Sequence, residues 1–118
     1  MPREAVVSLA TSLVEIPSHD DETEAGDFIA GWLREETNAT VHRDDAGNVI
    51  ARRQSGDSAS NTSLAFVGHH DVVPPADDQL DADGGYRIER RDGRLYGRGT
   101  ADMKGALAAA LLAFRDAD

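Results

Sequence analysis

An apolar run that leads into a histidine and an aspartate constrains this chain more than any other segment. Residues 64–68 read Leu-Ala-Phe-Val-Gly, and His69, His70 and Asp71 follow directly. A short, nearly continuous apolar run is typical of a strand that is buried on both faces of a sheet. Alternate side chains of a strand share a face, so His69 and Asp71 would lie together and His70 on the other side. The sequence therefore predicts a buried strand over residues 64–68 with an imidazole and a carboxylate at its end.

A histidine next to a carboxylate is common in protein metal sites. One ring nitrogen binds the ion, and the other donates its proton to the carboxylate, which fixes the orientation of the ring. His69 is therefore a candidate metal ligand and Asp71 its candidate orienting partner. A hydrogen-bonded histidine at a strand end, and a turn-forming aspartate before Pro74, stay open as purely structural alternatives. His19 and His42 fit no such pattern, and we expect them at the surface.

A second block, residues 92–105, reads Asp-Gly-Arg-Leu-Tyr-Gly-Arg-Gly-Thr-Ala-Asp-Met-Lys-Gly. Its opening Asp-Gly pair is a strong signal for the two-residue turn of a β-hairpin. Asp102 is a candidate metal ligand, although an aspartate directly before a helix would also serve as an N-cap on any protein. Lys104 and the glycines do not match the Gly-x-x-x-x-Gly-Lys-Ser/Thr pattern of a phosphate-binding loop, so we do not expect nucleotide binding.

Together the two blocks resemble those of a zinc-dependent family that includes succinyl-diaminopimelate desuccinylases, acetylornithine deacetylases, aminoacylases and glutamate carboxypeptidases. The first family signature, Gly-His-x-Asp-Val-Val-Pro, corresponds to residues 68–74, and the second corresponds to residues 92–105. The resemblance implies that His69 binds zinc, that Asp71 is a catalytic residue that orients His69, and that Asp102 bridges two zinc ions. It also implies a cis peptide bond after Asp102. Co²⁺ and Mn²⁺ stay open as alternatives, because imidazole and carboxylate sites accept several divalent ions.

The activity that the resemblance implies is amide hydrolysis of a small N-acyl amino acid or peptide by two zinc ions, in a protein that is a possible homodimer. The Val-Val-Pro-Pro sequence at residues 72–75 is similar to that of the desuccinylase and deacetylase branch. That branch removes a succinyl or acetyl group. It usually carries a tryptophan and a Pro-Phe pair before the hairpin, where this chain has Asp-Gly-Gly-Tyr at residues 83–86. This departure weakens the choice of substrate.

The family also uses a glutamate general base, a glutamate ligand, a further acidic ligand and a late histidine, all of which follow the bridging aspartate. The only adjacent glutamates in this chain, Glu35 and Glu36, precede Asp102. We therefore expect residues 1–118 to be the N-terminal part of a metallohydrolase catalytic domain, without its C-terminal catalytic part or its dimerisation domain. Such a chain would bind zinc weakly and would not hydrolyse substrate alone. A non-catalytic remnant, or an α/β module that binds a partner, is the alternative.

The spacing of apolar residues gives the expected secondary structure. Helices are predicted over residues 3–15, 22–36 and 103–114, and strands over residues 39–43, 48–53, 64–68, 86–90 and 94–96. A surface loop is predicted over residues 54–61, which are rich in serine, glycine and aspartate. Helices that alternate with strands indicate an α/β fold, here the N-terminal portion of a domain with a mixed sheet and helices on both faces.

The charge of the chain excludes some classes of partner. The net charge is −10, and eleven of the twelve basic residues are arginines. A field of this sign repels phosphate backbones, so we do not expect nucleic-acid binding. Acidic, lysine-poor surfaces are also typical of proteins adapted to high salt. No apolar run is long enough to span a bilayer, and the first residues lack the apolar core of a signal peptide. We therefore expect a cytoplasmic protein without a membrane partner.

Overall fold

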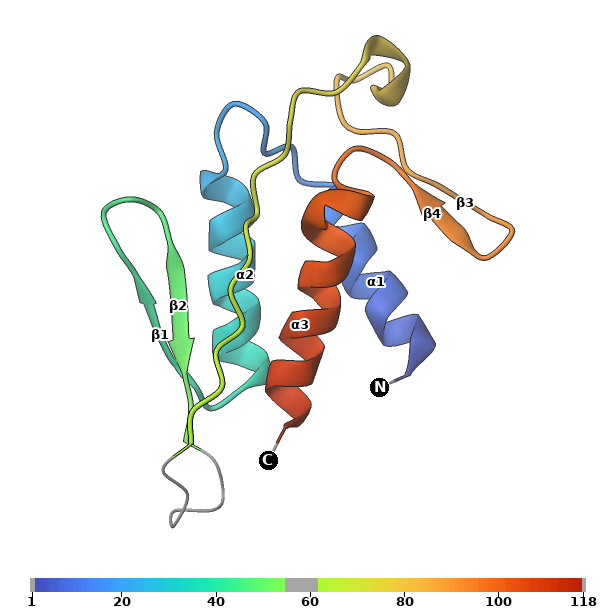
Figure 1. Ribbon diagram of the computed structural model, residues 1–118. Helices are drawn as coiled ribbons and strands as arrows, with labels where there is room; N and C mark the ends of the chain where they lie inside the picture. Colours follow the sequence, from blue (N-terminus) through green and yellow to red (C-terminus); the bar gives the residue numbers. More distant parts are fainter. Residues whose placement is uncertain (1, 55–61, 118) are drawn as a thin grey trace.

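The computed structural model describes residues 2–54 and 62–117 (Figure 1). Most of the loop predicted at residues 54–61 therefore lies outside the described residues. Three α-helices, α1 (Arg3–Val14), α2 (Thr23–Glu36) and α3 (Gly105–Asp116), combine with four short strands, as a mixed α/β class requires. The strands are β1 (Thr40–Arg43), β2 (Val49–Arg52), β3 (Glu89–Arg91) and β4 (Arg94–Tyr96), and two short helical turns cover Asp77–Gln79 and Thr100–Lys104.

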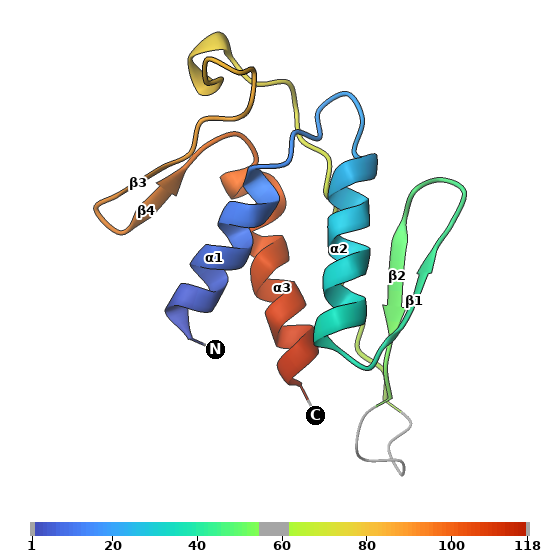
Figure 2. The same ribbon diagram turned by 180° about the vertical axis from the view of Figure 1, so that it is seen from behind.

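The core lies between the three helices, with α3 in the middle and α1 and α2 on either side (Figures 1 and 2). Each helix has apolar residues at helical spacing, so one face of each is buried. Trp32 is partly buried and packs against this core from α2. The buried cluster consists of Leu9, Ala10, Leu13, Ile29, Leu33, Ala108, Leu111 and Leu112.

The strands pair as two separate antiparallel hairpins, β1 with β2 and β3 with β4. The β3–β4 turn confirms the hairpin that the Asp-Gly pair predicts, because Asp92 and Gly93 both have positive φ, at 52° and 75°. Positive φ at both central residues gives the turn a twist that matches the twist of the flanking strands. The β1–β2 hairpin lies beside α2 (Figure 1).

The predicted buried strand at residues 64–68 is wrong for this structure. The segment is extended but pairs with no described strand, and Leu64, Phe66 and Val67 are 82%, 51% and 92% exposed. It runs across the face formed by α2 and α3 towards the Asp77–Gln79 turn (Figure 1). A strand is buried only when neighbouring strands cover its edges and other layers cover its faces. Apolar composition alone does not supply those neighbours.

The third helix begins two residues later than predicted, at Gly105, and its N-cap residue is Lys104. Asp102 has non-helical backbone angles, φ −134° and ψ 90°, inside the preceding turn. Its alternative role as the N-cap of this helix is therefore not supported. The peptide bond between Asp102 and Met103 is cis, as the resemblance implies. No helix among the described residues combines the length and the apolar character needed to cross a membrane.

Candidate metal centre

The two sequence blocks meet at two glycines. A Cβ atom on Gly68 would lie 2.8 Å from Cε of Met103, whose sulfur also lies 3.4 Å from the backbone nitrogen of His69. A Cβ atom on Gly99 would lie 2.6 Å from Cγ1 of Val72. Gly99 also has a positive φ of 88°, so a side chain there would meet Val72 and strain the backbone, whereas at Gly68 the flexible end of the Met103 side chain could move aside. These two contacts hold the segment that carries His69 against the turn that carries Asp102.

His69 lies between two aspartates, one from each block. Its Nδ1 atom is 3.1 Å from Oδ1 of Asp71 and 3.1 Å from the Asp71 backbone carbonyl oxygen. Its Nε2 atom is 2.9 Å from Oδ1 of Asp102, which lies thirty-three positions along the chain. Both ring nitrogens therefore face carboxylates. The structure brings together the three site residues that the sequence predicts, with Asp71 on the ring nitrogen that an orienting partner would use.

These three side chains are accessible from solvent, at 46% exposed for His69, 63% for Asp71 and 81% for Asp102. Partial burial of the His69 ring acts to lower its pKa. Hydrogen bonds to the Asp71 carbonyl and to the Asp102 carboxylate, with the charges of both aspartates, outweigh that effect and raise the pKa above its ordinary value. The site is thus an open, negatively charged surface that favours positive charge at the ring.

The donor set fits part of a metal site. Two ligands about 2.0–2.2 Å from one tetrahedral zinc ion lie roughly 3.3–3.5 Å apart. His69 Nε2 and Asp102 Oδ1 are slightly closer, at 2.9 Å, and both side chains are exposed enough to move outwards. Within residues 2–54 and 62–117, no group of three or more metal-binding side chains is arranged around a common point. The described residues therefore offer two donors and one orienting partner.

The other histidines lie elsewhere. His70 points away from the site, since its Nε2 atom would be 3.3 Å from a Cβ atom on Gly26 in α2, and burial lowers its pKa. His42 is exposed on β1, as predicted. His19 is not a free surface residue, because its Nδ1 atom lies 2.5 Å from the hydroxyl oxygen of Tyr86. No periodic pattern or motif in the sequence indicates this contact between His19 and Tyr86.

The burial of Lys104 is likewise not apparent from the sequence. This residue has no exposed surface, and its Nζ atom donates a 2.7 Å hydrogen bond to the carbonyl of Ile16. Burial lowers the pKa of Lys104 to about 8. Lysine is almost never fully buried, so no sequence rule would place this one inside. The only feature of the sequence that draws attention to Lys104 is its position two residues after Asp102.

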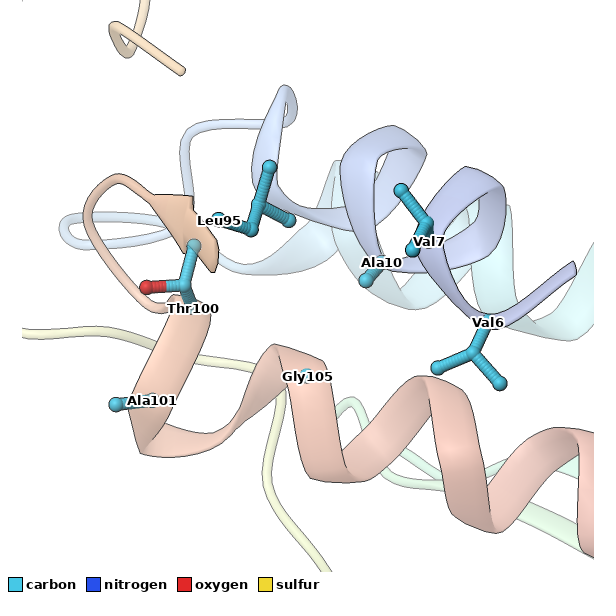
Figure 3. Close-up of a pocket in the computed structure, with 7 residues that line it drawn as sticks. All are labelled: Val6, Val7, Ala10, Leu95, Thr100, Ala101 and Gly105. Carbon is cyan, nitrogen blue, oxygen red and sulfur yellow. The ribbon is translucent and has the colours of Figure 1, made fainter. Parts of the chain in front are cut away.

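A shallow apolar pocket lies on the α1 side of the Thr100–Lys104 turn (Figure 3). It has a volume of about 260 Å³, and one of its lining residues, Ala101, precedes Asp102. None of its lining side chains is titratable, so the pocket adds no donor to the site. The lining residues are Val6, Val7, Ala10, Leu95, Thr100, Ala101 and Gly105.

Both blocks lie within a segment that matches a known protein family. The model of peptidase family M20/M25/M40 matches residues 65–118. A succinyl-diaminopimelate desuccinylase of Nitrobacter hamburgensis is 36% identical over 110 residues, which cover 86% of this chain and 27% of that protein. The corresponding enzyme of Methylocella silvestris is 38% identical over 110 residues, with 87% and 28% covered.

A third relative, the succinyl-diaminopimelate desuccinylase of Novosphingobium aromaticivorans, is 36% identical over 115 residues, which cover 91% of this chain and 30% of that protein. The chain thus spans less than a third of the length of these curated relatives. The family match includes His69, Asp71 and Asp102, the residues that the structure brings together. On these grounds the chain belongs to peptidase family M20/M25/M40.

Proposed function

We propose that the protein which carries this chain is a metal-dependent amidohydrolase that removes an acyl group, succinyl or acetyl, from an N-acyl amino acid. The observation that carries the proposal is the position of the His69 ring between Asp71, 3.1 Å from Nδ1, and Asp102, 2.9 Å from Nε2. Residues 1–118 would form the N-terminal part of its catalytic domain. The desuccinylase names of the relatives favour a succinyl substrate.

In this proposal His69 and Asp102 are metal ligands, and Asp71 holds the ring of His69. Asp71 would accept a hydrogen bond from the Nδ1 proton, which would leave Nε2 of His69 available as a metal ligand. A bound divalent ion would lower the pKa of a coordinated water and polarise the amide carbonyl of the substrate. Zinc is the ion we propose, with two per complete site and Asp102 shared between them. Co²⁺ and Mn²⁺ are the chemical alternatives.

We also propose that the 118-residue chain alone binds zinc weakly and does not hydrolyse substrate. Catalytic zinc usually has three protein ligands and a water, whereas the described residues offer two donors at this site. Turnover by the pure chain that disappears on chelation would contradict this part of the proposal. A non-catalytic module that binds a partner would be indifferent to zinc and to the loss of His69.

The test is an amine-release assay of the complete gene product with N-succinyl and N-acetyl amino acids, before and after chelation and zinc return. We expect zinc-dependent release that His69→Ala abolishes. His42→Ala is the matched control, because His42 is an exposed histidine on β1 outside the site. Equal activity of both variants, or activity that survives chelation, would overturn the proposal.

A further inference from the structure

Lys104 is the single lysine of the chain and is held in its interior. Its Nζ atom donates to the Ile16 carbonyl at 2.7 Å and lies 5.9 Å from the centre of the Tyr86 ring. None of the ion pairs between described residues includes it. A buried ammonium group without a carboxylate partner is costly. Its presence two residues after Asp102 therefore calls for a role in the geometry of that turn.

The loop that Lys104 holds is bonded to the other arm of the site as well. Ser18 is completely buried, and its carbonyl accepts a 3.1 Å hydrogen bond from the backbone N–H of Val72, the residue after Asp71. The residues Ile16 to Ser18 thus bridge the two sequence blocks. One end is bonded to the residue after Asp71, and the other to the lysine that follows Asp102.

Tyr86 contacts the same loop through its hydroxyl group. Its side chain is 5% exposed, and its hydroxyl oxygen accepts a 3.2 Å hydrogen bond from the Ser18 backbone N–H. The hydroxyl is also 2.5 Å from Nδ1 of His19, and the two rings lie 5.7 Å apart. The hydroxyl is fully engaged in binding the loop, so it is not directed at a substrate.

We propose that Lys104 and Tyr86 are positioning residues, which clamp the loop of residues 16–19 between the two sequence blocks and so fix the distance between His69 and Asp102. Neither residue is a metal ligand in this scheme. The part of the inference that concerns metal affinity rests on the proposed function. The part that concerns the His69–Asp102 contact does not, and it is testable without metal.

The experiment uses the complete gene product with Lys104→Met and Tyr86→Phe. Tyr96→Phe is the matched control for the second variant, because Tyr96 is a partly exposed tyrosine on β4. Leu33→Ala controls for lost stability, because Leu33 is a core residue of α2 and is not part of the loop. Tyr86→Phe keeps the ring and removes only the hydroxyl, so it decides the question if Lys104→Met does not fold.

Two readouts need no metal. In both clamp variants we expect hydrogen exchange of the Val72 amide to be about tenfold faster, as for the loss of one buried hydrogen bond. We also expect the ¹⁵N resonance of His69 Nε2 to move towards that of exposed His42. Leu33→Ala and Tyr96→Phe should leave the His69 resonance in place. Unchanged exchange and resonances in a folded clamp variant, or an equal change in Leu33→Ala, would overturn the inference.

The third readout is zinc affinity by competition with a chelating dye. We expect zinc affinity to be about tenfold weaker in the clamp variants, because losing a residue that orients a metal ligand typically costs about 10–100-fold. Zinc affinity should be unchanged in Tyr96→Phe. Wild-type affinity in both folded clamp variants would overturn the inference and leave the proposed function standing. Absence of zinc binding by the wild-type protein would overturn the proposed function, and the two metal-free readouts would still decide the inference.

Discussion

Gly99 packs directly against Val72, which places the second sequence block on the residue that follows Asp71. A Cβ atom on Gly99 would lie 2.6 Å from Val72 Cγ1, and the φ angle of Gly99 is +88°. We expect backbone strain in Gly99→Ala to lower the free energy of unfolding by about 1–3 kcal/mol. The clash of the new methyl group with Val72 would lower it further. Urea denaturation measures the change.

Gly31→Ala is the control for that substitution. Gly31 lies inside α2, and a Cβ atom there would meet no atom within 4 Å apart from its chain neighbours and the nearby backbone of its own helix. Alanine is favoured over glycine in a helix by about 0.5–1 kcal/mol, so this variant should be slightly more stable than the wild type. A similar loss in both variants would contradict the close packing of Gly99.

Two leucines distinguish the helical core from the extended segment. Leu13 has no exposed surface, whereas Leu64 is 82% exposed. We expect Leu13→Ala to cost about 2–5 kcal/mol of unfolding free energy, from lost burial and a cavity. Leu64→Ala should change it by less than about 0.5 kcal/mol. A large loss of unfolding free energy in Leu64→Ala would mean that Leu64 is buried, as the sequence predicts, and would contradict the structure.

Asp44 closes the turn between β1 and β2. Hydrogen bonds from the side chain and backbone of Asn48 hold its pKa below the ordinary value of 3.8. Because the pKa of Asp44 is lower in the folded than in the unfolded protein, these hydrogen bonds stabilise the fold at pH values above the unfolded-state pKa. The stabilisation is lost as the pH falls through the lowered pKa of the folded protein. We expect Asn48→Ala to raise the pKa of Asp44 towards 3.8, as followed by ¹³C NMR of the carboxyl carbon. The same pKa in both proteins would contradict the assignment.

The net charge of −10 predicts a salt-dependent stability. Repulsion among carboxylates destabilises the compact state, and an increase from about 0.1 to 1 M KCl shortens the screening length from roughly 10 to 3 Å. We therefore expect the melting temperature to rise over this range, as measured by circular dichroism. Sucrose at equal osmolality is the control for general solute exclusion. A constant or lower melting temperature in KCl would contradict adaptation to high salt.

Local signals predicted the helices and the second hairpin. The repeats that include Leu9 with Leu13, and Ile29 with Leu33, mark buried helix faces whatever lies opposite them, and a two-residue Asp-Gly turn needs only its own backbone angles. The prediction of a buried strand at residues 64–68 is wrong because burial of a strand depends on neighbours far away in sequence. The apolar composition of a segment does not show whether such neighbours are present.

The candidate site was predictable only in part. His69, Asp71 and Asp102 follow from residue types in two signature blocks, and the structure brings them within hydrogen-bonding distance. The roles of these residues in metal binding stay predictions. The burial of Lys104 and its contact with Tyr86 depend on how the loop before α2 packs against both residues. Neither residue has a periodic pattern that would reveal such a contact.

In the proposed function, His69 and Asp102 bind the same metal ion. A double-mutant cycle of zinc affinity in the complete gene product, with His69→Ala, Asp102→Ala and the pair, tests it most directly. We predict that each single variant loses at least about tenfold in affinity and that the second substitution costs much less once the first is present, because residues that share one partner are not additive. Additive losses, or zinc affinity that neither substitution changes, would contradict the claim.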